Sequence, residues 1–242
     1  MGDKPVTMES LMAVLMEVKE MNKKHQEEII KLSSKVIVLE KENIVLKKEV
    51  RSLKESANRH EQATRILTVR ILGMPVTTEE SSSAPADRNK VAVSTAYENI
   101  IKPILVAAKE KKIINAVPQQ KTAIIDGFRL KSSSTDKNGR PYPPPIIIRF
   151  TEKIFRQAVF LCKREAMPNL FTEGASASVY PRILIVEDLT PATIKKMKEL
   201  REDDRVEKVW STEGVIRFTL VSDPSKVRKC PGVFTPINEI IK

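Results

Sequence analysis

Apolar residues recur every seven positions through the first quarter of the chain. Neither Pro nor Gly occurs between Pro5 and Gly73, so no residue there interrupts a helix. When Met8 is taken as heptad position a, twelve of the sixteen a and d positions up to His60 are apolar. A repeat of this length is typical of a coiled coil rather than of a helix in a globular core. We therefore predict a coiled coil over residues 1–64.

Charged residues beside this seam indicate how the helices pair. In a parallel coil, each g residue meets the e residue five positions later on its neighbour. The three such pairs are opposite in sign: Lys35 with Glu40, Glu42 with Lys47, and Glu49 with Lys54. Asn at two a positions penalises slipped registers, because a buried amide would lose its partner. We expect a parallel homo-oligomer, and the residues alone do not decide between dimer and trimer. The seam residues on which it should depend are Leu11, Leu15, Asn22, Ile29, Leu32, Val36, Leu39, Asn43, Leu46, Val50 and Leu53.

The middle of the chain alternates between strand and helix patterns. We predict strands at residues 67–72, 122–130 and 146–150, and helices at about 90–112 and 152–165. Pro103 lies inside the first helical pattern, where we expect a break or a fresh helix start. The order β-α-β-β-α predicts a ferredoxin-like, RNA-recognition-type domain over residues 65–178 that needs one more strand. The fold class is therefore α+β.

The last segment, residues 179–242, predicts a small α/β domain. It begins with a candidate strand at 182–187, followed by Thr190 as N-cap and Pro191 at the first position of a helix that runs to about residue 201. A hairpin follows, with arms at 206–210 and 215–221 and a four-residue loop at 211–214.

Positive charge is concentrated in the middle domain. The chain has 42 Lys and Arg against 31 Asp and Glu, and residues 65–178 hold 18 basic and 10 acidic side chains. An excess of eight charges in one small domain favours a polyanion as partner. We expect nucleic acid rather than a membrane, because no stretch approaches the roughly 20 apolar residues that a bilayer span needs.

Alternation along the strands assigns a candidate binding face. On residues 146–150 it directs Ile147 and Arg149 outward, and on the first strand it directs Thr68 and Arg70 outward. This open face carries two arginines and no aromatic ring. We therefore expect contacts mainly to the phosphate backbone of a single strand, with low sequence specificity and strong salt dependence.

Further candidate contacts lie outside this face. The loop before the third strand holds Arg140 and Tyr142, which an ordinary surface loop explains equally well. On the hairpin, alternation places Lys208, Trp210 and Arg217 on one face, although Trp210 packed against the helix is a competing interpretation. The helix adds Lys195 and Lys196 beside an apolar row of Ile194, Met197 and Leu200.

Catalysis is not expected. His25 and His60 both lie in the coil seam, and neither Cys162 nor Cys230 has a histidine in reach of a plausible arrangement. Two cysteines cannot form a zinc knuckle or a disulfide framework, which favours a reducing compartment. We predict no enzyme activity, no cofactor and no metal.

These residues resemble a known family, the first-open-reading-frame proteins of LINE-type non-LTR retrotransposons. The resemblance rests on a heptad coil followed by Leu72-Gly73-Met74-Pro75, Ile146-Ile147-Ile148-Arg149-Phe150-Thr151-Glu152-Lys153 and Asp188-Leu189-Thr190-Pro191-Ala192-Thr193. The stretch from Lys208 to Arg217 is also similar to the C-terminal domain of baculovirus few-polyhedra proteins.

The resemblance implies a parallel homotrimer, with a dimer as second choice, that binds single-stranded RNA and acts as a nucleic-acid chaperone in a ribonucleoprotein. Single-stranded DNA is the second candidate ligand, and the expected location is the cytoplasm, with the nucleus second. Arg149 matches the family's third-strand arginine, and Arg140 lies in the basic loop before it. Pro144 and Pro145 stand where relatives often carry a basic residue.

A second function class is a coiled-coil scaffold whose globular end binds protein. Salt distinguishes the two, because binding through several phosphates weakens steeply as salt rises, whereas a mixed protein interface does not.

Overall fold

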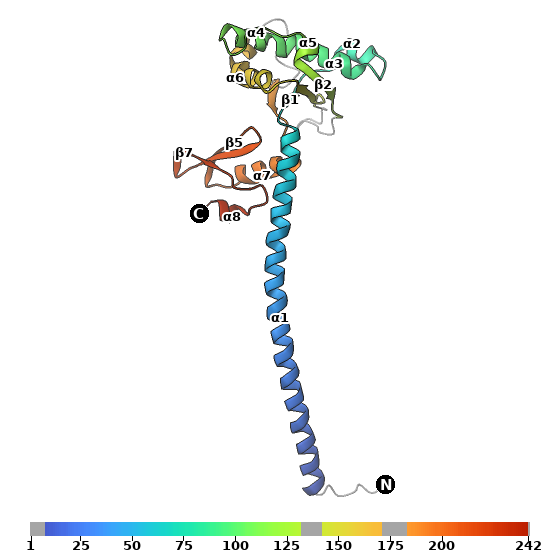
Figure 1. Cartoon of the computed structure of the whole chain (residues 1–242), viewed down its shortest axis with the longest axis vertical. Helices are drawn as coiled ribbons and strands as arrows, with labels where there is room; N and C mark the ends of the chain where they lie inside the picture. Colours follow the sequence, from blue (N-terminus) through green and yellow to red (C-terminus); the bar gives the residue numbers. More distant parts are fainter. Residues whose placement is uncertain (1–7, 132–141, 171–182, 242) are drawn as a thin grey trace. The chain divides into compact units, whose positions relative to one another are not determined.

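The structure is a computed structural model that describes residues 8–131, 142–170 and 183–241. Its contacts divide the chain into two units, Met1–Lys54 and Glu55–Lys242. The chain is a mixed helix-and-sheet protein whose first element, helix α1 (Met8–Thr64), runs without a break for 57 residues (Figure 1). The predicted long N-terminal helix is confirmed, and we call Glu55–Lys242 the globular unit.

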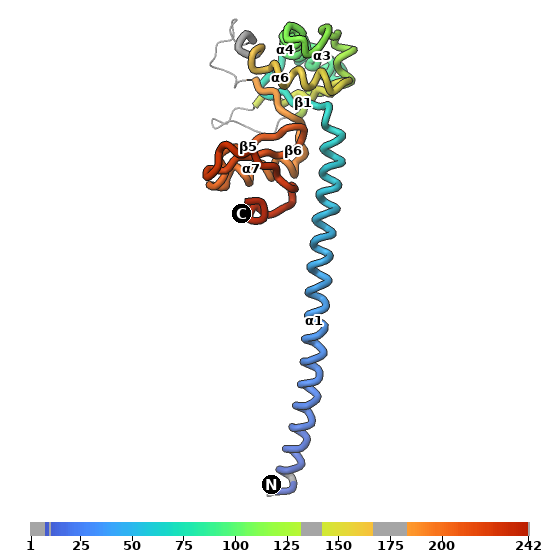
Figure 2. The backbone as a smooth tube through the Cα atoms, turned by 60° about the vertical axis from the view of Figure 1, so that its left-hand side comes forward, coloured from blue at the N-terminus to red at the C-terminus, as the bar shows by residue number. Residues whose placement is uncertain are grey.

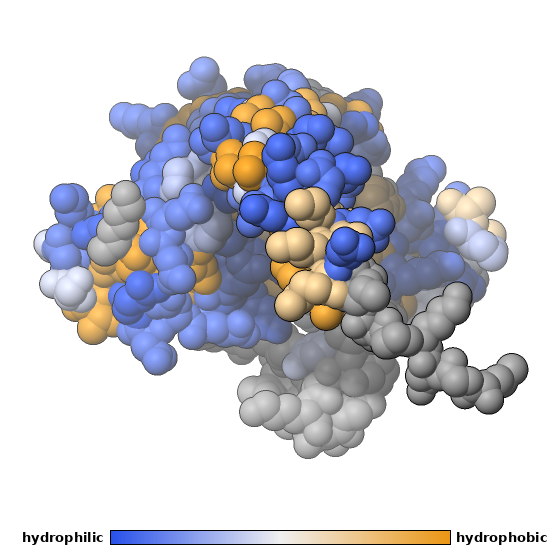
Figure 3. Space-filling view, turned by 90° about the horizontal axis from the view of Figure 1, so that it is seen from below, coloured by the Kyte–Doolittle hydropathy of each residue, from blue (hydrophilic) through white to orange (hydrophobic). Residues whose placement is uncertain are grey.

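The apolar side chains of α1 are exposed in the single chain. The exposed fractions of the large apolar seam residues range from 43% at Val18 to 78% at Met8. Figure 3 views the molecule from the N-terminal end of α1 and shows apolar side chains at the surface beside hydrophilic ones. The Asn43 side chain donates to the Leu39 carbonyl of its own helix at 3.2 Å.

The first sheet has four antiparallel strands in the order β2-β3-β1-β4. They are β1 (Thr68–Leu72), β2 (Ile124–Arg129), β3 (Ile146–Phe150) and β4 (Leu184–Glu187). β4 supplies the missing strand, since its residues pair with β1. The expectation that this strand opens the last domain is wrong, because position along the chain does not determine which sheet edge a strand joins.

Helices cover one face of this sheet, as the tube trace shows (Figure 2). They are α3 (Arg88–Ala96), the π-helix η1 (Tyr97–Ile101), α4 (Lys102–Glu110) and α6 (Lys153–Leu170), with short α2 (Thr78–Ser82) and α5 (Gln120–Ala123) beside them. The expected break or fresh start at Pro103 is wrong, because the backbone stays helical through Ile101 and Lys102 and accommodates the proline with one wider turn, in which the Lys102 amide donates to the Tyr97 carbonyl.

The helical stretch Arg88–Glu110 is long and apolar enough to cross a membrane by length and composition alone, and half of its apolar window is buried. Its buried side chains, such as Ile101, Ile104 and Leu105, belong to the core that forms against the sheet. A core helix passes the same length and composition test.

The core of the first sheet follows the predicted alternation on one face only. Ile146, Ile148 and Phe150 are fully buried, as predicted. Thr68 and Ile147, which the alternation directs outward, are each only 6% exposed. The face away from the helices is therefore less open than two-residue periodicity suggests, because neighbouring strands bring large side chains across it.

The second sheet has three antiparallel strands, β5 (Val206–Thr212), β6 (Val215–Leu220) and β7 (Asp223–Lys229), and packs with α7 (Pro191–Arg201) and α8 (Ile237–Ile240). Thr190 caps α7 as predicted, accepting from the Thr193 amide at 3.2 Å. The predicted four-residue hairpin loop is wrong. The turn has two residues, Glu213 and Gly214, with φ of 53° and 77°, which suit a tight hairpin turn. β7 was not predicted.

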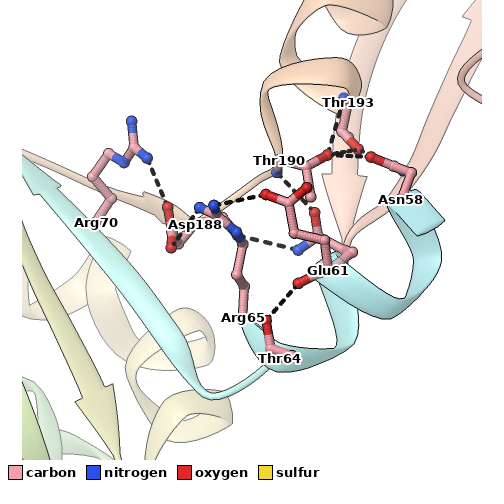
Figure 4. Close-up of polar contacts among 9 residues, drawn as sticks. Asn58, Glu61, Thr64, Arg65, Arg70, Asp188, Thr190 and Thr193 are labelled. Atoms are coloured by element: carbon pink, nitrogen blue, oxygen red, sulfur yellow. Dashed lines mark hydrogen bonds and ion pairs between the residues drawn. The ribbon is translucent and has the colours of Figure 1, made fainter.

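The last three turns of α1 and the residue that follows them contact the C-terminal segment through four polar side chains, which we call the latch: Glu55, Asn58, Gln62 and Arg65. Glu55 accepts from the Val233 and Phe234 amides at 3.1 and 2.6 Å. Asn58 accepts from the Thr190 hydroxyl at 2.6 Å, and Gln62 accepts from the Thr190 amide at 3.0 Å (Figure 4). Residues 55–64, assigned to the coil by sequence, therefore also belong to the globular unit.

Candidate nucleic-acid interface

The outward face of the first sheet carries a row of side chains across all four strands. Register places Phe128 of β2 beside Ile147 of β3, Ile147 beside Arg70 of β1, and Arg70 beside Val186 of β4. Directly opposite residues share a face of the sheet. Phe128 is 44% exposed, so the expectation of a face without an aromatic ring is wrong. That expectation considered only the first and third strands.

Arg149 lies on this face and is already paired. Its guanidinium makes a two-point contact with Asp126, through Nε to Oδ1 at 3.1 Å and through Nη2 to Oδ2. Both side chains are about half exposed. Exposed pairs of this kind contribute about 0–1 kcal/mol, so a phosphate can replace Asp126 at little cost.

Arg70 and Arg65 share one buried carboxylate (Figure 4). Asp188 Oδ1 accepts from Arg70 Nη2 at 2.7 Å, and Asp188 Oδ2 accepts from Arg65 Nη1 at 3.2 Å. Nε of Arg70 is buried and has no hydrogen-bond partner among the residues that the structure describes. Arg70 therefore faces the site with one donor still to be satisfied.

A groove of about 900 Å³ adjoins Arg70. Its walls come from β1, α6 and β4 on one side and from α7 and β5 on the other. Apolar and aromatic side chains form much of its lining, and four basic side chains stand among them: Phe160, Leu161, Val186, Ile194, Met197 and Trp210, with Arg70, Arg156, Lys163 and Arg201. A basic groove with aromatic rings is typical of single-strand binding, in which bases stack and phosphates meet cations.

Phe160 on the groove wall lies between two cations. Arg156 Cζ is 4.8 Å and Lys163 Nζ is 4.5 Å from the ring centroid. Lys163 also donates to the Ile185 carbonyl at 2.7 Å. Burial lowers the pKa of Lys163, and the nearby Arg164 charge lowers it further. The ring is therefore held in a fixed place beside positive charge.

Arg156 forms the buried ion pair of the groove. It is 3% exposed, and its Nη2 donates to Glu187 Oε1 at 2.6 Å. Its Nε, like that of Arg70, has no hydrogen-bond partner within the described part of the chain. Burial raises the pKa of Glu187. Hydrogen bonds from Ser211, Gly214 and Arg156 and the Arg156 charge lower it more, so the pKa lies below its ordinary value of 4.5.

The tip of the β5–β6 hairpin is tied to this pair. Glu187 accepts from the Glu213 amide at 2.6 Å and from the Gly214 amide at 3.2 Å. The Glu213 carboxylate in turn pairs with Lys153 at 2.7 Å. These contacts fix β5, and with it Trp210, at the edge of the groove.

Trp210 is half-buried and lines the groove, so it is neither a fully packed core residue nor a free surface ring. Cross-strand register places Arg217 beside Trp210 and Lys229 beside Arg217. Lys208 is exposed and contacts Glu207 at 3.1 Å. The hairpin residues Lys208, Trp210 and Arg217 therefore share one region as expected, and β7 adds Lys229 beside Arg217.

Lys196 is not available as a contact. It is 6% exposed, and its ammonium donates to Glu199 at 2.6 Å and to the Thr235 carbonyl at 3.0 Å. The buried face of α7 runs through Thr193, Lys196, Met197 and Leu200. Ile194, predicted in the apolar row, is instead 45% exposed in the groove. Met197 and Leu200 of that row are buried as predicted, and Thr190 and Thr193 at the start of the helix form hydrogen bonds with Asn58 of the latch. Lys195 is exposed, as expected.

The remaining predicted contacts lie at the third-strand loop. Tyr142 is 40% exposed just before β3. Arg140 lies outside the described residues. Phe128, Arg156, Phe160 and Lys163 were not predicted as site residues. In the sequence, an aromatic residue on a helix or an edge strand resembles a core position, and a basic residue resembles a solvated one. Only the folded structure shows that three of them line the groove.

No metal centre is evident in residues 8–131, 142–170 and 183–241, where no three His, Cys, Asp or Glu side chains converge. Cys162 and Cys230 are buried free thiols, and burial raises the pKa of each. A raised pKa leaves the thiol protonated and weakly nucleophilic.

No protein-family model matches the chain, and no curated protein matches it significantly.

Proposed function

We propose that the protein is a homo-oligomer that binds single-stranded nucleic acid, RNA first and DNA second, with low sequence specificity. The observation that carries this proposal is the groove, where Phe160 and Trp210 stand among Arg70, Arg156, Lys163 and Arg201. Partly exposed Arg70 and exposed Arg201 in the groove lining support phosphate as ligand, because a guanidinium that solvent reaches can donate to it.

The rest of the chain fits this proposal. The strand order β2-β3-β1-β4 with helices on one face supports a ferredoxin-like, RNA-recognition-type domain. The exposed heptad seam of α1 supports a parallel coiled coil, a trimer first and a dimer second. Together with the sequence resemblance, these features favour a nucleic-acid chaperone of a retrotransposon ribonucleoprotein in the cytoplasm or, second, the nucleus.

The test is binding of a labelled, unstructured RNA strand by the full-length protein across a salt series. We expect affinity to fall steeply as salt rises, because each phosphate contact releases a counterion. Arg201→Ala should lower affinity at every sequence and reduce the salt slope by about one. Trp210→Ala should lower affinity by about 1–3 kcal/mol with little change in slope, since stacking carries no charge.

Matched controls lie outside the groove lining. Lys198→Ala removes one charge from the exposed side of α7, and Phe234→Ala removes one exposed ring. Equal losses of RNA affinity from Lys198→Ala and Arg201→Ala would show that binding depends on overall positive charge and not on the groove. Absence of binding at low salt would overturn the proposal.

The second candidate is a coiled-coil scaffold with a protein-binding globular end. It is favoured by the carboxylates that already pair with the sheet-face arginines, Asp126 with Arg149 and Asp188 with Arg70. A neutralised face suits a protein partner better than a polyanion. Salt-insensitive retention of a protein partner, without RNA affinity, would establish this alternative.

A further inference from the structure

A second groove, of about 1070 Å³, lies along strand β2. Within the part of the chain that the structure describes, it shares no lining residue with the groove beside Arg70. Its walls are α3, η1 and α4 on one side and residues 117–127, which include α5 and the start of β2, on the other. Figure 1 shows α3 and α5 beside β2, which is an edge strand of the first sheet. We call it the edge groove, and its main lining residues are Lys90, Val93, Tyr97, Lys121, Ile125 and Gly127.

The buried part of the edge groove is mainly aliphatic. Val93 and Ile124 line it and are buried, and Ile125 is 54% exposed. Tyr97 is the one aromatic ring in the described lining, and it is buried, with its hydroxyl donating to the Pro118 carbonyl. Single-strand binding uses exposed rings on which bases stack. The edge groove therefore suits aliphatic side chains rather than bases.

The backbone of β2 directs hydrogen-bonding groups into the edge groove. The Leu130 amide donates to the Pro145 carbonyl, on the side of β3. The Arg129 amide donates to the other side, to Asn89 Oδ1 of α3 at 3.0 Å. Peptide groups point to alternate sides of an antiparallel strand, so the amide and carbonyl of Gly127 point the same way as the Arg129 amide. Among the described residues no strand lies on this side of β2, and an open edge of this kind accepts an added strand.

The charges of the edge groove indicate which partner it fits. Its charged lining residues are Lys90, Glu98, Lys102, Lys121 and Asp126. The two acidic ones are each paired, Glu98 with Lys102 at 2.6 Å and Asp126 with Arg149 of β3. The other two lysines are exposed and have no ion pair within the residues that the structure describes. The unpaired charge of the edge groove is therefore positive, which favours carboxylates on a partner.

We propose that the edge groove binds an extended acidic peptide of a partner protein as an added strand on β2. The peptide backbone pairs with the outward amide and carbonyl of Gly127. Alternate aliphatic side chains of the peptide enter the groove beside Val93 and Ile125, and its carboxylates meet Lys90 and Lys121. This site goes beyond the proposed function, because its lining is separate from the groove that is proposed to bind RNA.

The edge of β2 also limits the length of the added strand. At one end, Asn89 already occupies the Arg129 amide. At the other end, the β-bulge between Ile124 and Asp126 interrupts the strand register. The partner segment is therefore a short extended peptide and not a long strand or a sheet.

The first test is binding of a short labelled peptide of alternating valine and glutamate to the full-length protein, followed by fluorescence anisotropy. Two control peptides separate charge from strand pairing. Alternating valine and lysine reverses the charge, and N-methylation at alternate residues of the valine–glutamate peptide removes backbone donors while keeping the charge. Both controls should bind about tenfold more weakly or less. Absence of binding by the valine–glutamate peptide, or equal binding of its N-methylated form, overturns the added strand.

The second test changes the protein. Lys90→Glu with Lys121→Glu should weaken binding of the valine–glutamate peptide about tenfold, because both lysines line the edge groove. The matched control is Lys109→Glu with Lys226→Glu, which changes net charge equally at two exposed lysines outside the lining. Equal losses of peptide affinity in the two double variants would overturn the assignment to the edge groove.

RNA binding by the same two variants separates this inference from the proposed function. They should lose RNA affinity equally, since none of the four lysines lines the groove beside Arg70. A larger loss of RNA affinity from Lys90→Glu with Lys121→Glu would assign the edge groove to nucleic acid and overturn the peptide site. Failure of the peptide to bind leaves the RNA measurement unaffected.

Discussion

The same residue types stand in opposite environments in the two units of the chain. In α1 the Leu, Ile and Val of the heptad seam are about half exposed or more, whereas Val69, Ile71 and Ile148 of the first sheet are fully buried. Burial of apolar surface contributes roughly 25 cal/mol per Å². The sheet gains this stabilisation inside the single chain, whereas the exposed seam residues do not. In the oligomer that we propose, a second chain would bury these rows, since an isolated helix is marginal in water.

The largest effect should come from opening the internal core. Phe150→Ala, at a fully buried position, should cost about 3–5 kcal/mol of unfolding free energy, through lost burial and a cavity. Urea unfolding followed by near-ultraviolet circular dichroism measures it. Leu39→Ala removes a similar apolar group from the seam and should leave that transition in place while lowering the oligomer mass. An equal loss of unfolding free energy in both variants would contradict the view that only the globular unit is stabilised by burial within the chain.

Two ion pairs of the first sheet allow a buried interaction to be compared with an exposed one. Glu187→Ala leaves Arg156 buried without its carboxylate and should destabilise the globular unit by about 3–5 kcal/mol. Asp126→Ala breaks the exposed pair with Arg149 and should cost about 0–1 kcal/mol. Thermal unfolding of both variants compares the two, and similar shifts in melting temperature would show that burial does not decide the outcome.

A smaller effect is expected at the hairpin turn. Gly214 has φ of 77°, and a Cβ there would clash with the Gln62 side chain. Gly214→Ala should therefore cost about 1–2 kcal/mol for the left-handed backbone and also disturb the latch. Hydrogen exchange at the Thr190 amide, which donates to Gln62, measures the second consequence. Unchanged protection of the Thr190 amide from exchange would show that the substitution does not disturb the latch.

The smallest effect should be a pH dependence at the hairpin tip. Because the folded pKa of Glu187 is lowered, its contribution to stability is complete above its ordinary value of 4.5 and is lost as pH falls through the lower folded value. The amide resonances of Glu213 and Gly214 should report this between about pH 6 and pH 3. A midpoint at or above 4.5 would contradict the assignment of these donors to a stabilised carboxylate.

Sequence patterns predicted elements whose signals are local. β3 was predicted at Ile146–Phe150 because alternation follows a proline run, and α7 at Pro191 because Thr190 and Pro191 form a start signal. β7 was missed because Pro224 and scattered charges obscure an edge strand. The groove could not be predicted, since its walls come from five elements and a local pattern does not state which edges meet.

Polar interactions were harder to foresee than apolar ones. The latch residues follow a 3-4-3 spacing, yet on a coil that face is ordinarily solvated, so the spacing carried no signal. The burial of Lys196 depends on the Thr235 carbonyl, 39 residues away. Such contacts depend on the assembled fold, whereas apolar periodicity is present in the sequence itself.

The latch has a consequence for valency. Its contacts use Glu55, Asn58 and Gln62 and leave the seam positions Ala57 and His60 exposed. In the proposed oligomer, each helix would therefore carry its own globular unit, and the number of binding units would equal the number of helices that associate. A seam substitution that turns a trimer into a dimer would remove one binding unit from a bound strand and so lower the effective concentration of the others. The fold of the remaining globular units would not change.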